Sequence, residues 1–346
     1  MEAVAQVLAV VIFVVMFVAI ITDKWHRYIP AMVGAGLVLL VLFLIILRSP
    51  ESVTSILNLG QIGQGQFWIP GEQHIESQGV NWQTIIFIGG MMVMVEGLGE
   101  VGFFRWLCLL IAKQVNYKVV PILVTFMLLS AFLAMFIDSI TVLLFLATVT
   151  VELARMLKFD PVPIIIAEIF AANVGGAATM SGDPPNIIIG TAFGYNFFDF
   201  LTNTGPIAWI GVLLTLAFFY FAFRKALRSS QGAVDPHQRY PEPSEAIVDL
   251  GLFRINSGIF VFVVVLLVTH AMTGLSVAII GVIAAGLTLV AGFRKAGHVM
   301  RRVDWRTLVF FIALFIVVGG LEETGSLVIL AEFIKNVSGG DIVLVI

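Results

Sequence analysis

Long apolar runs alternate with short polar segments along the whole chain. An α-helix needs about 20 apolar residues to cross a hydrocarbon layer about 30 Å thick, and seven runs reach or approach that length. The predicted spans are residues 3–21, 30–47, 84–98, 205–223, 257–270, 275–292 and 307–321. This pattern predicts an all-α integral membrane protein with several crossings.

The placement of cationic residues predicts the orientation of these spans. No cationic segment precedes the first run, and Lys24 and Arg27 follow it, so we interpret it as an anchored helix and not as a signal peptide. With this topology, all Lys and Arg residues except Arg48 and Lys335 fall on one side. Because cationic loops stay in the cytoplasm, we predict a multi-pass protein of the cytoplasmic membrane. Its N-terminus and the loop 48–82 should lie outside.

The composition excludes several classes of function. Of 346 residues, 60% are hydrophobic and 12% charged, with a mean hydropathy of +1.05, whereas soluble domains carry about 25% charged residues. A net charge of -3 leaves no basic surface for nucleic acid. One cysteine, Cys108, and five scattered histidines form no disulfide framework and no metal-ligand spacing. We find no catalytic constellation and predict no enzyme, cofactor or resident metal.

One segment occurs twice, and its matched positions keep a constant offset along the chain. These positions are Trp82, Thr84, Phe87, Leu98, Glu100 and Gly102 with Trp305, Thr307, Phe310, Leu321, Glu323 and Gly325. By the cation pattern, the first copy enters from outside and the second from the cytoplasm. Inverted repeats are typical of secondary transporters, whose site lies near the midplane. Since the second copy starts at Trp305 and the sequence stops at Ile346, we expect the second repeat to be incomplete and the chain to be truncated at its C-terminus.

A broken transmembrane helix is predicted between residues 164 and 195. The apolar runs 164–173 and 187–195 are each too short to span, and three glycines and two prolines interrupt the segment between them. Asp183 before Pro184 and Pro185 is typical of a helix N-cap. Unwound backbone at membrane depth is tolerated only inside protein or beside a wet cavity, so we predict a binding site here. The candidate residues are Asn173, Gly175, Gly176, Thr179, Ser181, Asp183 and Asn186. A surface loop between two interfacial helices is the alternative.

A re-entrant hairpin is predicted around Asp138. Cations flank residues 129–146 on the same side, so this segment should enter the membrane and return. Asp138, Ser139 and Thr141 would lie near its tip. An ionisable residue in a membrane segment is functional by default, although Asp138 could also be hydrogen-bonded between helices. Glu168 is a candidate either for proton coupling or for structural pairing.

The motif at residues 173–186, with Gly-Asp-Pro-Pro-Asn at its end, resembles the signature of the ion transporter superfamily. It is most similar to the P-protein and arsenite-permease branch, which is related to citrate and dicarboxylate permeases. Residues 130–142 resemble the hairpin of that branch, and residues 82–113 its first scaffold segment. The resemblance implies two inverted repeats, each with a re-entrant hairpin and a broken helix. It also implies a homodimer with an elevator-like motion.

This chain departs from the pattern of the branch in two respects. Asp138-Ser139 replaces the usual Asp-Asn at the hairpin tip, which puts the ion preference in doubt. A second hairpin and a second broken helix do not follow before Ile346. Half of the site would then be missing, and this polypeptide alone should not transport.

The domain organisation predicted from these features has five parts. Residues 1–81 form two helices and an outer loop, 82–223 the first repeat, 224–256 a cytoplasmic loop, 257–304 a linking hairpin and 305–346 the start of the second repeat.

The function predicted is ion-coupled secondary transport of a small anion, either an arsenite-type oxyanion or a carboxylate. H⁺ or Na⁺ would be the coupling ion, with Na⁺ held by Asp138, Asn173 and Ser181. The alternative is a Na⁺/H⁺ antiporter in which Asp138 and Glu168 alternate between H⁺ and Na⁺. A passive channel or a membrane scaffold is a third hypothesis.

Overall fold

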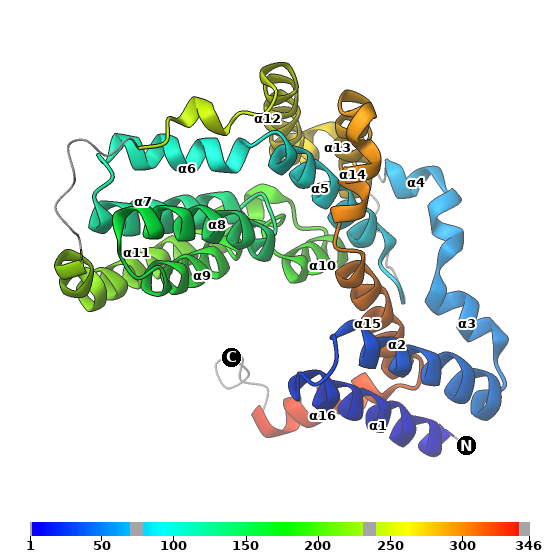
Figure 1. Cartoon of the computed structure of the whole chain (residues 1–346). Helices are drawn as coiled ribbons and strands as arrows, with labels where there is room; N and C mark the ends of the chain where they lie inside the picture. The colour runs from blue at the N-terminus through cyan, green and yellow to red at the C-terminus, as the bar shows by residue number, and fades with distance from the viewer. Residues whose placement is uncertain (1, 70–78, 231–239, 339–346) are drawn as a thin grey trace. The chain divides into compact units, whose positions relative to one another are not determined.

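The computed structural model describes residues 2–69, 79–230 and 240–338 (Figure 1). Part of the predicted outer loop, residues 70–78, lies outside these ranges. All regular structure in the described ranges is helical, which confirms the predicted all-α class. Short helices among the spans are α3 (Pro50–Leu57), η2 (Leu59–Gly63), α4 (Gly65–Trp68), η3 (Pro243–Ala246), η4 (Phe293–Lys295) and α14 (Ala296–Arg302).

Seven helical segments within the described ranges are long and apolar enough to cross a membrane. They are α1 (Glu2–Ile21), α2 (Tyr28–Leu37) with its continuation η1 (Val38–Leu47), α5 (Trp82–Glu100), α8 (Ser139–Leu157), α11 (Phe197–Ser230), α12 (Leu250–Thr273) and α15 (Trp305–Glu323). Six of them contain predicted spans. The seventh predicted span is the 15-residue helix α13 (Val277–Ala291), which is too short alone and bends by 96° into η4 and α14. The additional long helix, α8, is the second arm of the predicted hairpin.

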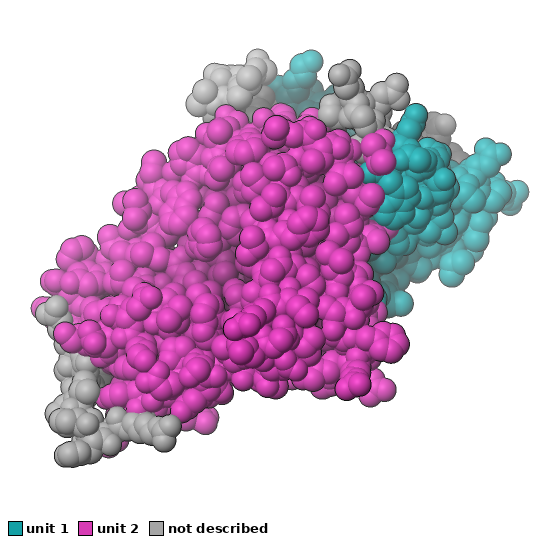
Figure 2. All heavy atoms as spheres, turned by 90° about the horizontal axis from the view of Figure 1, so that it is seen from above, with its two compact units in different colours: residues 1–68, 75–85, 304–346 teal, residues 69–74, 86–303 magenta. Residues whose placement is uncertain are grey.

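Two compact units make up the chain (Figure 2). Unit 1 contains residues 1–68, 75–85 and 304–346, and unit 2 contains residues 69–74 and 86–303. In unit 1, α1, α2 and α15 pack around small and branched side chains. Gly34 permits this approach, since a Cβ there would lie 3.3 Å from Met16 Sδ and from Val317 Cγ2. The last helix of the unit is α16 (Ser326–Ser338).

Unit 2 contains the segments predicted above as a broken helix and as a hairpin. Its remaining helices are α6 (Phe103–Gln114), α7 (Val119–Ala134), α9 (Val162–Gly176) and α10 (Pro184–Phe193). Helices α7, α8, α9 and α11 pack side by side, with α6 against α7 and α8 (Figure 1). Within the same unit α5 passes very close to α13, because a Cβ on Gly90 would lie 2.1 Å from the Gly281 carbonyl oxygen. This close approach fixes the face that α5 turns toward the helix breaks.

The two copies of the sequence repeat share their local structure. Asn81 caps α5 by accepting from the Thr84 amide at 3.0 Å, and Asp304 caps α15 by accepting from the Thr307 amide at 3.3 Å. Both helices have 19 residues, and each is followed by a left-handed glycine at the matching position, Gly102 or Gly325. A positive φ at these positions favours glycine. The two copies therefore share a helix, its N-terminal cap and the turn that follows it. Their inverted orientation in the membrane stays a prediction.

Candidate functional site

Two helix breaks in unit 2 lie close to the positions that the sequence predicts. The first break, Met135–Asp138, separates α7 from α8, which pack against each other. The second break, residues 177–183, separates α9 from α10. The predicted start of the second break was wrong, because α9 continues beyond Asn173 to Gly176. Re-entry of the α7–α8 hairpin from one side of the membrane stays a prediction.

Asp138 ends the first break as the N-cap of α8. Its Oδ2 accepts hydrogen bonds from the Thr141 amide at 3.1 Å and from Thr141 Oγ1 at 3.0 Å. A side-chain acceptor at this position satisfies one of the backbone donors that the first helical turn leaves unpaired. The positive end of the α8 dipole also lies here and favours negative charge. Asp138 is half-buried, and its N-cap hydrogen bonds and the helix dipole stabilise a carboxylate at the hairpin tip.

Asp183 holds the equivalent N-cap position of α10 but makes no side-chain cap. Its Oδ1 instead accepts a hydrogen bond from Ser139 Oγ at 2.9 Å, which joins the second break to the start of α8. The prediction that Asp183 caps α10 through its side chain was therefore wrong. Pro184 and Pro185 have no amide hydrogen, and the amides of Asn186 and Ile187 donate to the Asp183 carbonyl at 3.0 and 3.4 Å. The first four residues of α10 thus offer no free amide to an anion.

Hydroxyl and amide side chains tie the second break to the first. Thr179 Oγ1 and Ser181 Oγ both donate to the Met135 carbonyl, the latter at 3.1 Å. Asn186 Nδ2 donates to the carbonyls of Gly176 and Thr179 at 3.2 and 2.9 Å. Thr179 and Ser181 are buried. These contacts satisfy backbone carbonyls that the interrupted helices would otherwise leave unpaired.

Glycines allow the two breaks to pack closely. A Cβ on Gly175 would lie 2.4 Å from the Ala131 carbonyl oxygen, and one on Gly182 would lie 2.2 Å from that of Gly176. A Cβ on Gly176 would lie 2.4 Å from Asp183 Oδ2. None of the three positions can hold a larger residue unless the backbone or a carboxylate moves. The predicted site residues Gly175 and Gly176 therefore support the site through packing.

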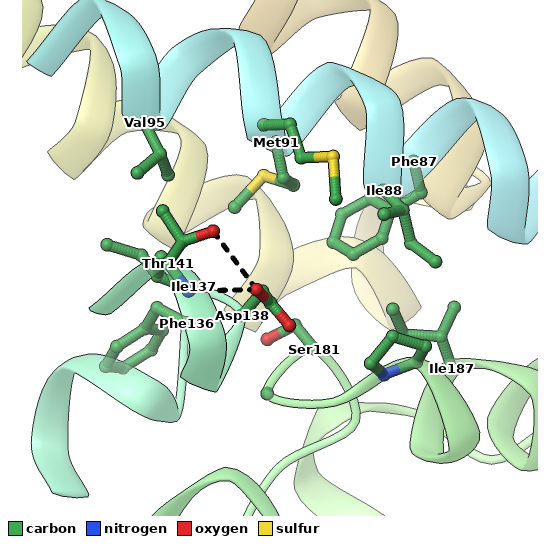
Figure 3. A pocket seen from close by; sticks show the side chains of 13 residues that line it. Phe87, Ile88, Met91, Val95, Phe136, Ile137, Asp138, Thr141, Ser181 and Ile187 are labelled. Atoms are coloured by element: carbon green, nitrogen blue, oxygen red, sulfur yellow. Dashed lines mark hydrogen bonds between the residues drawn. The ribbon is translucent and has the colours of Figure 1, made fainter. Parts of the chain in front are cut away.

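A pocket opens beside the two breaks (Figure 3). Asp138, Thr141 and Ser181 are its polar side chains. Gly182 and Pro184 line it near the start of α10. The remaining lining residues are Phe87, Ile88, Met91, Met92, Val95, Phe136, Ile137 and Ile187. A mostly apolar pocket with a few convergent polar groups is the usual form of a small-molecule site.

Asp138 is the carboxylate that lines this pocket, and Asp183 lies near Asp138 without lining the pocket. Asp138 and Asp183 are close enough to act on each other, and both are partly withdrawn from water. The described residues that line the pocket include no Lys, Arg or His. Two nearby carboxylates repel each other unless a cation or a proton lies with them. The arrangement can thus hold a small cation directly and an anion only together with one.

Two predicted site residues lie away from this pocket. Asn173 is exposed on α9 and donates from Nδ2 to the carbonyl of Ile169 at 2.9 Å. Glu168 is fully buried where α7, α8 and α9 meet. Thr150 Oγ1 donates to Glu168 Oε1 at 2.6 Å, whereas Oε2 has no hydrogen-bond partner among the described residues. The structure therefore brings together Asp138, Ser139, Thr141, Thr179, Ser181, Asp183 and Asn186, and neither Asn173 nor Glu168 lines the pocket.

The sequence analysis assigned α5 to the scaffold and missed its part in the pocket. Five of its side chains line the pocket, and the four of them that Figure 3 labels lie above Asp138 in that view. The five are Phe87, Ile88, Met91, Met92 and Val95. Their spacing of three and four residues places them on one helix face. The sequence pattern of an apolar membrane helix does not distinguish a pocket-lining face, because the lipid-facing side chains are apolar as well.

The sequence is similar to those of known membrane proteins over most of its length. The sequence model of a family described as citrate transporter matches residues 17–346. A 46 kDa membrane protein of Mycobacterium leprae is 30% identical over 339 residues, which are 97% of this chain and 72% of that protein. An uncharacterized transporter of Mycobacterium tuberculosis is 29% identical over 98% of this chain and 73% of its own length. The human P protein is 32% identical over 159 residues, which are 45% of this chain and 18% of that protein.

Proposed function

Because this chain belongs to the citrate transporter family, we propose that the full-length protein transports a small carboxylate anion across the membrane, coupled to H⁺ or Na⁺. The family assignment makes it a multi-pass membrane transporter, in agreement with its apolar helices. Among the anions expected from the sequence, the family description favours a carboxylate over an arsenite-type oxyanion. Citrate is the first substrate to test.

The junction of the two helix breaks is the observation that supports this proposal. Interrupted helices near the midplane form substrate and ion sites in secondary transporters. Here Ser139 donates to Asp183 across the breaks, and Ser181 of the second break donates to Met135 of the first. A solute in the adjoining pocket would contact both interrupted helices at once. Movement of one break relative to the other would then change access to it.

The carboxylates at the junction explain why transport of an anion would need a coupling cation. An anion brought next to Asp138 and Asp183 is repelled at short range, since a membrane interior screens charge poorly. A proton or a Na⁺ ion bound at Asp138 removes this repulsion. Asp138 Oδ1, Ser181 Oγ and nearby carbonyls supply the oxygen ligands that a hard cation takes. Cation and anion would therefore bind together, which is the thermodynamic basis of coupled transport.

Flux in proteoliposomes tests this proposal. The full-length protein should accumulate labelled citrate when an inward H⁺ or Na⁺ gradient is imposed, and uptake should saturate with citrate concentration. The Asp138→Asn variant should lose the stimulation by the gradient. Citrate flux that is linear in concentration and indifferent to both gradients would instead indicate a passive channel.

A Na⁺/H⁺ antiporter is the second candidate, and Glu168 is the observation that favours it. Among the described residues, one oxygen of this fully buried carboxyl group has no hydrogen-bond partner. Such a group is costly as a carboxylate and suits a proton carrier. In this alternative, Asp138 and Glu168 alternate between proton and Na⁺. Addition of Na⁺ to proteoliposomes with an imposed pH gradient would dissipate that gradient without any anion present. Loss of this activity in Glu168→Gln would support the antiporter.

We propose that the N-terminus lies outside the cytoplasmic membrane. All Lys and Arg residues except Arg48 and Lys335 then face the cytoplasm, as the distribution of cationic loops requires. A cysteine at Glu2, in a Cys108→Ser background, should react with an impermeant maleimide in intact cells. Reaction only after permeabilisation would show that the N-terminus lies in the cytoplasm.

A further inference from the structure

A second pocket lies beside the first within unit 2. Its lining residues are Phe87, Met180, Ser181, Ile187, Phe197, Leu267, His270 and Val277. The two pockets have Phe87, Ser181 and Ile187 in common. A small solute that passes these three residues would leave the neighbourhood of Asp138 and meet a different set of side chains.

His270 is the titratable side chain of this second pocket. The other lining residues are apolar, apart from Ser181, whose hydroxyl hydrogen is donated to the Met135 carbonyl. His270 lies in the last turn of α12, and none of the sequence motifs includes it. The Asp138 pocket thus presents a carboxylate, and the second pocket presents an imidazole.

A hydrogen bond at Nδ1 determines which ring nitrogen of His270 can gain or lose a proton. Nδ1 of this ring lies 2.8 Å from the Leu267 carbonyl oxygen. A carbonyl oxygen can only accept, so Nδ1 carries a hydrogen, and Nε2 is the nitrogen that gains or loses the second proton. In the neutral ring Nε2 is an acceptor and cannot bind an anion. After protonation it is a charged donor, the kind that forms strong hydrogen bonds with carboxylates.

Several groups act on a positive charge at this ring. His270 lies at the C-terminal end of α12, which favours a cation in its last turn. Asp199 of α11 acts on His270 electrostatically and also favours a cation. Burial opposes the charge, because the ring loses water. A carboxylate anion in the pocket would offset that loss, so the proton and the anion should bind to His270 together.

We propose that His270 is a second anion contact of the transport path, at which a carboxylate binds with a proton on Nε2. The inference rests on the proposed function and deepens it, because it assigns the proton to a group other than Asp138. In this scheme the carboxylate passes Phe87 between a cation-dependent pocket and a proton-dependent one. His270 is then a binding residue for the anion.

Calorimetry of citrate binding to the full-length protein in detergent tests this inference. Titrations in two buffers of different ionisation enthalpy measure the protons taken up for each citrate bound. The wild type should take up protons on binding. His270→Gln should bind citrate at least about tenfold more weakly, the equivalent of losing about 1.4 kcal/mol, and its proton uptake should decrease. His270→Lys should restore affinity with less proton uptake than the wild type, because an ammonium group has a higher pKa than an imidazole and is protonated before citrate binds.

A histidine outside the second pocket provides the matched control. His26→Gln removes an exposed histidine of unit 1 and should change neither quantity. Wild-type affinity and proton uptake in His270→Gln, with citrate transport intact in the wild type, would overturn the inference and leave the proposed function standing. A wild type without citrate-dependent flux would overturn the proposed function and the inference with it.

Discussion

Each of the two helix breaks in unit 2 ends with an aspartate at the N-cap of the next helix, but the two carboxylates have different hydrogen-bond partners. Asp138 is the N-cap of α8, and its carboxylate accepts from the Thr141 amide of the same helix. Asp183 is the N-cap of α10, and its carboxylate accepts from Ser139 of another helix. The first break has four residues and the second has seven.

The difference follows from the residues that come next. Ser139 and Ile140 leave α8 with ordinary first-turn amides, which need a side-chain acceptor. Pro184 and Pro185 remove two of those donors from α10, and so they release the Asp183 carboxylate for a partner elsewhere. A pair of prolines after an N-cap aspartate can thus turn a local cap into a contact between helices.

Replacement of Asp138 by Asn should have the largest effect on function. Asn caps a helix about as well as Asp, so the free energy of unfolding should stay close to that of the wild type. A contact with a charged group contributes about 1.5–3 kcal/mol, and its loss should lower gradient-driven citrate uptake by about 10- to 100-fold. Uptake in proteoliposomes and thermal unfolding together measure both quantities. Full coupled uptake in the variant would remove Asp138 from the mechanism.

Replacement of Gly182 by Ala should have the largest effect on structure. The new Cβ would lie 2.2 Å from the Gly176 carbonyl oxygen and 2.7 Å from that of Ala134. Since both neighbours are backbone, we expect a loss of about 1–3 kcal/mol in stability. Gly258→Ala in α12 is the matched control, because nothing lies within 4 Å of its Cβ position. Equal melting temperatures for the two variants would show that the breaks are not packed as described.

Replacement of Ser139 by Ala should weaken the contact between the two breaks. We expect a loss of about 1.5 kcal/mol and a raised KM for citrate. The combination with Asp183→Ala should add little to either single change, because both remove the same hydrogen bond. Thr148→Ala serves as control, since Thr148 Oγ1 donates within α8 to the Leu144 carbonyl. Strict additivity of the double variant would argue against the contact.

Replacement of Glu168 by Gln should have the smallest effect. The amide oxygen of Gln can still accept from Thr150 Oγ1, so we expect a change in stability below about 1 kcal/mol. In a citrate transporter coupled at Asp138, citrate uptake should be almost unchanged. A large loss of uptake would bring Glu168 into the coupling mechanism and would favour the antiporter alternative.

The sequence was sufficient to predict the class of the fold and the two breaks. Apolar runs long enough to cross a bilayer predicted the spans, and Gly-Asp-Pro-Pro-Asn predicted the second break. The end of α9 was predicted at Asn173 and lies at Gly176, because Gly175 and Gly176 were expected to end the helix. In the structure they stay helical, since only glycine permits contact with Ala131 and Asp183 at those positions. Packing outweighs the low helix propensity of glycine here.

Other features of the site depend on contacts that one-dimensional patterns do not contain. The hydrogen bond between Ser139 and Asp183 joins residues 44 positions apart. The α5 wall of the pocket has no polar residue to distinguish it from a lipid-facing surface, and His270 lies outside every motif. These groups become apparent only when the helices are packed.

Protection of a cysteine at Ser181 from modification tests the central claim most directly. Ser181 lines both pockets at the junction of the breaks. In the full-length protein with Cys108→Ser, a small thiol reagent should modify Ser181→Cys slowly, and citrate together with the coupling ion should slow the reaction further. Rapid modification by a bulky impermeant reagent, unaffected by citrate or cations, would place this segment in open water and contradict the account.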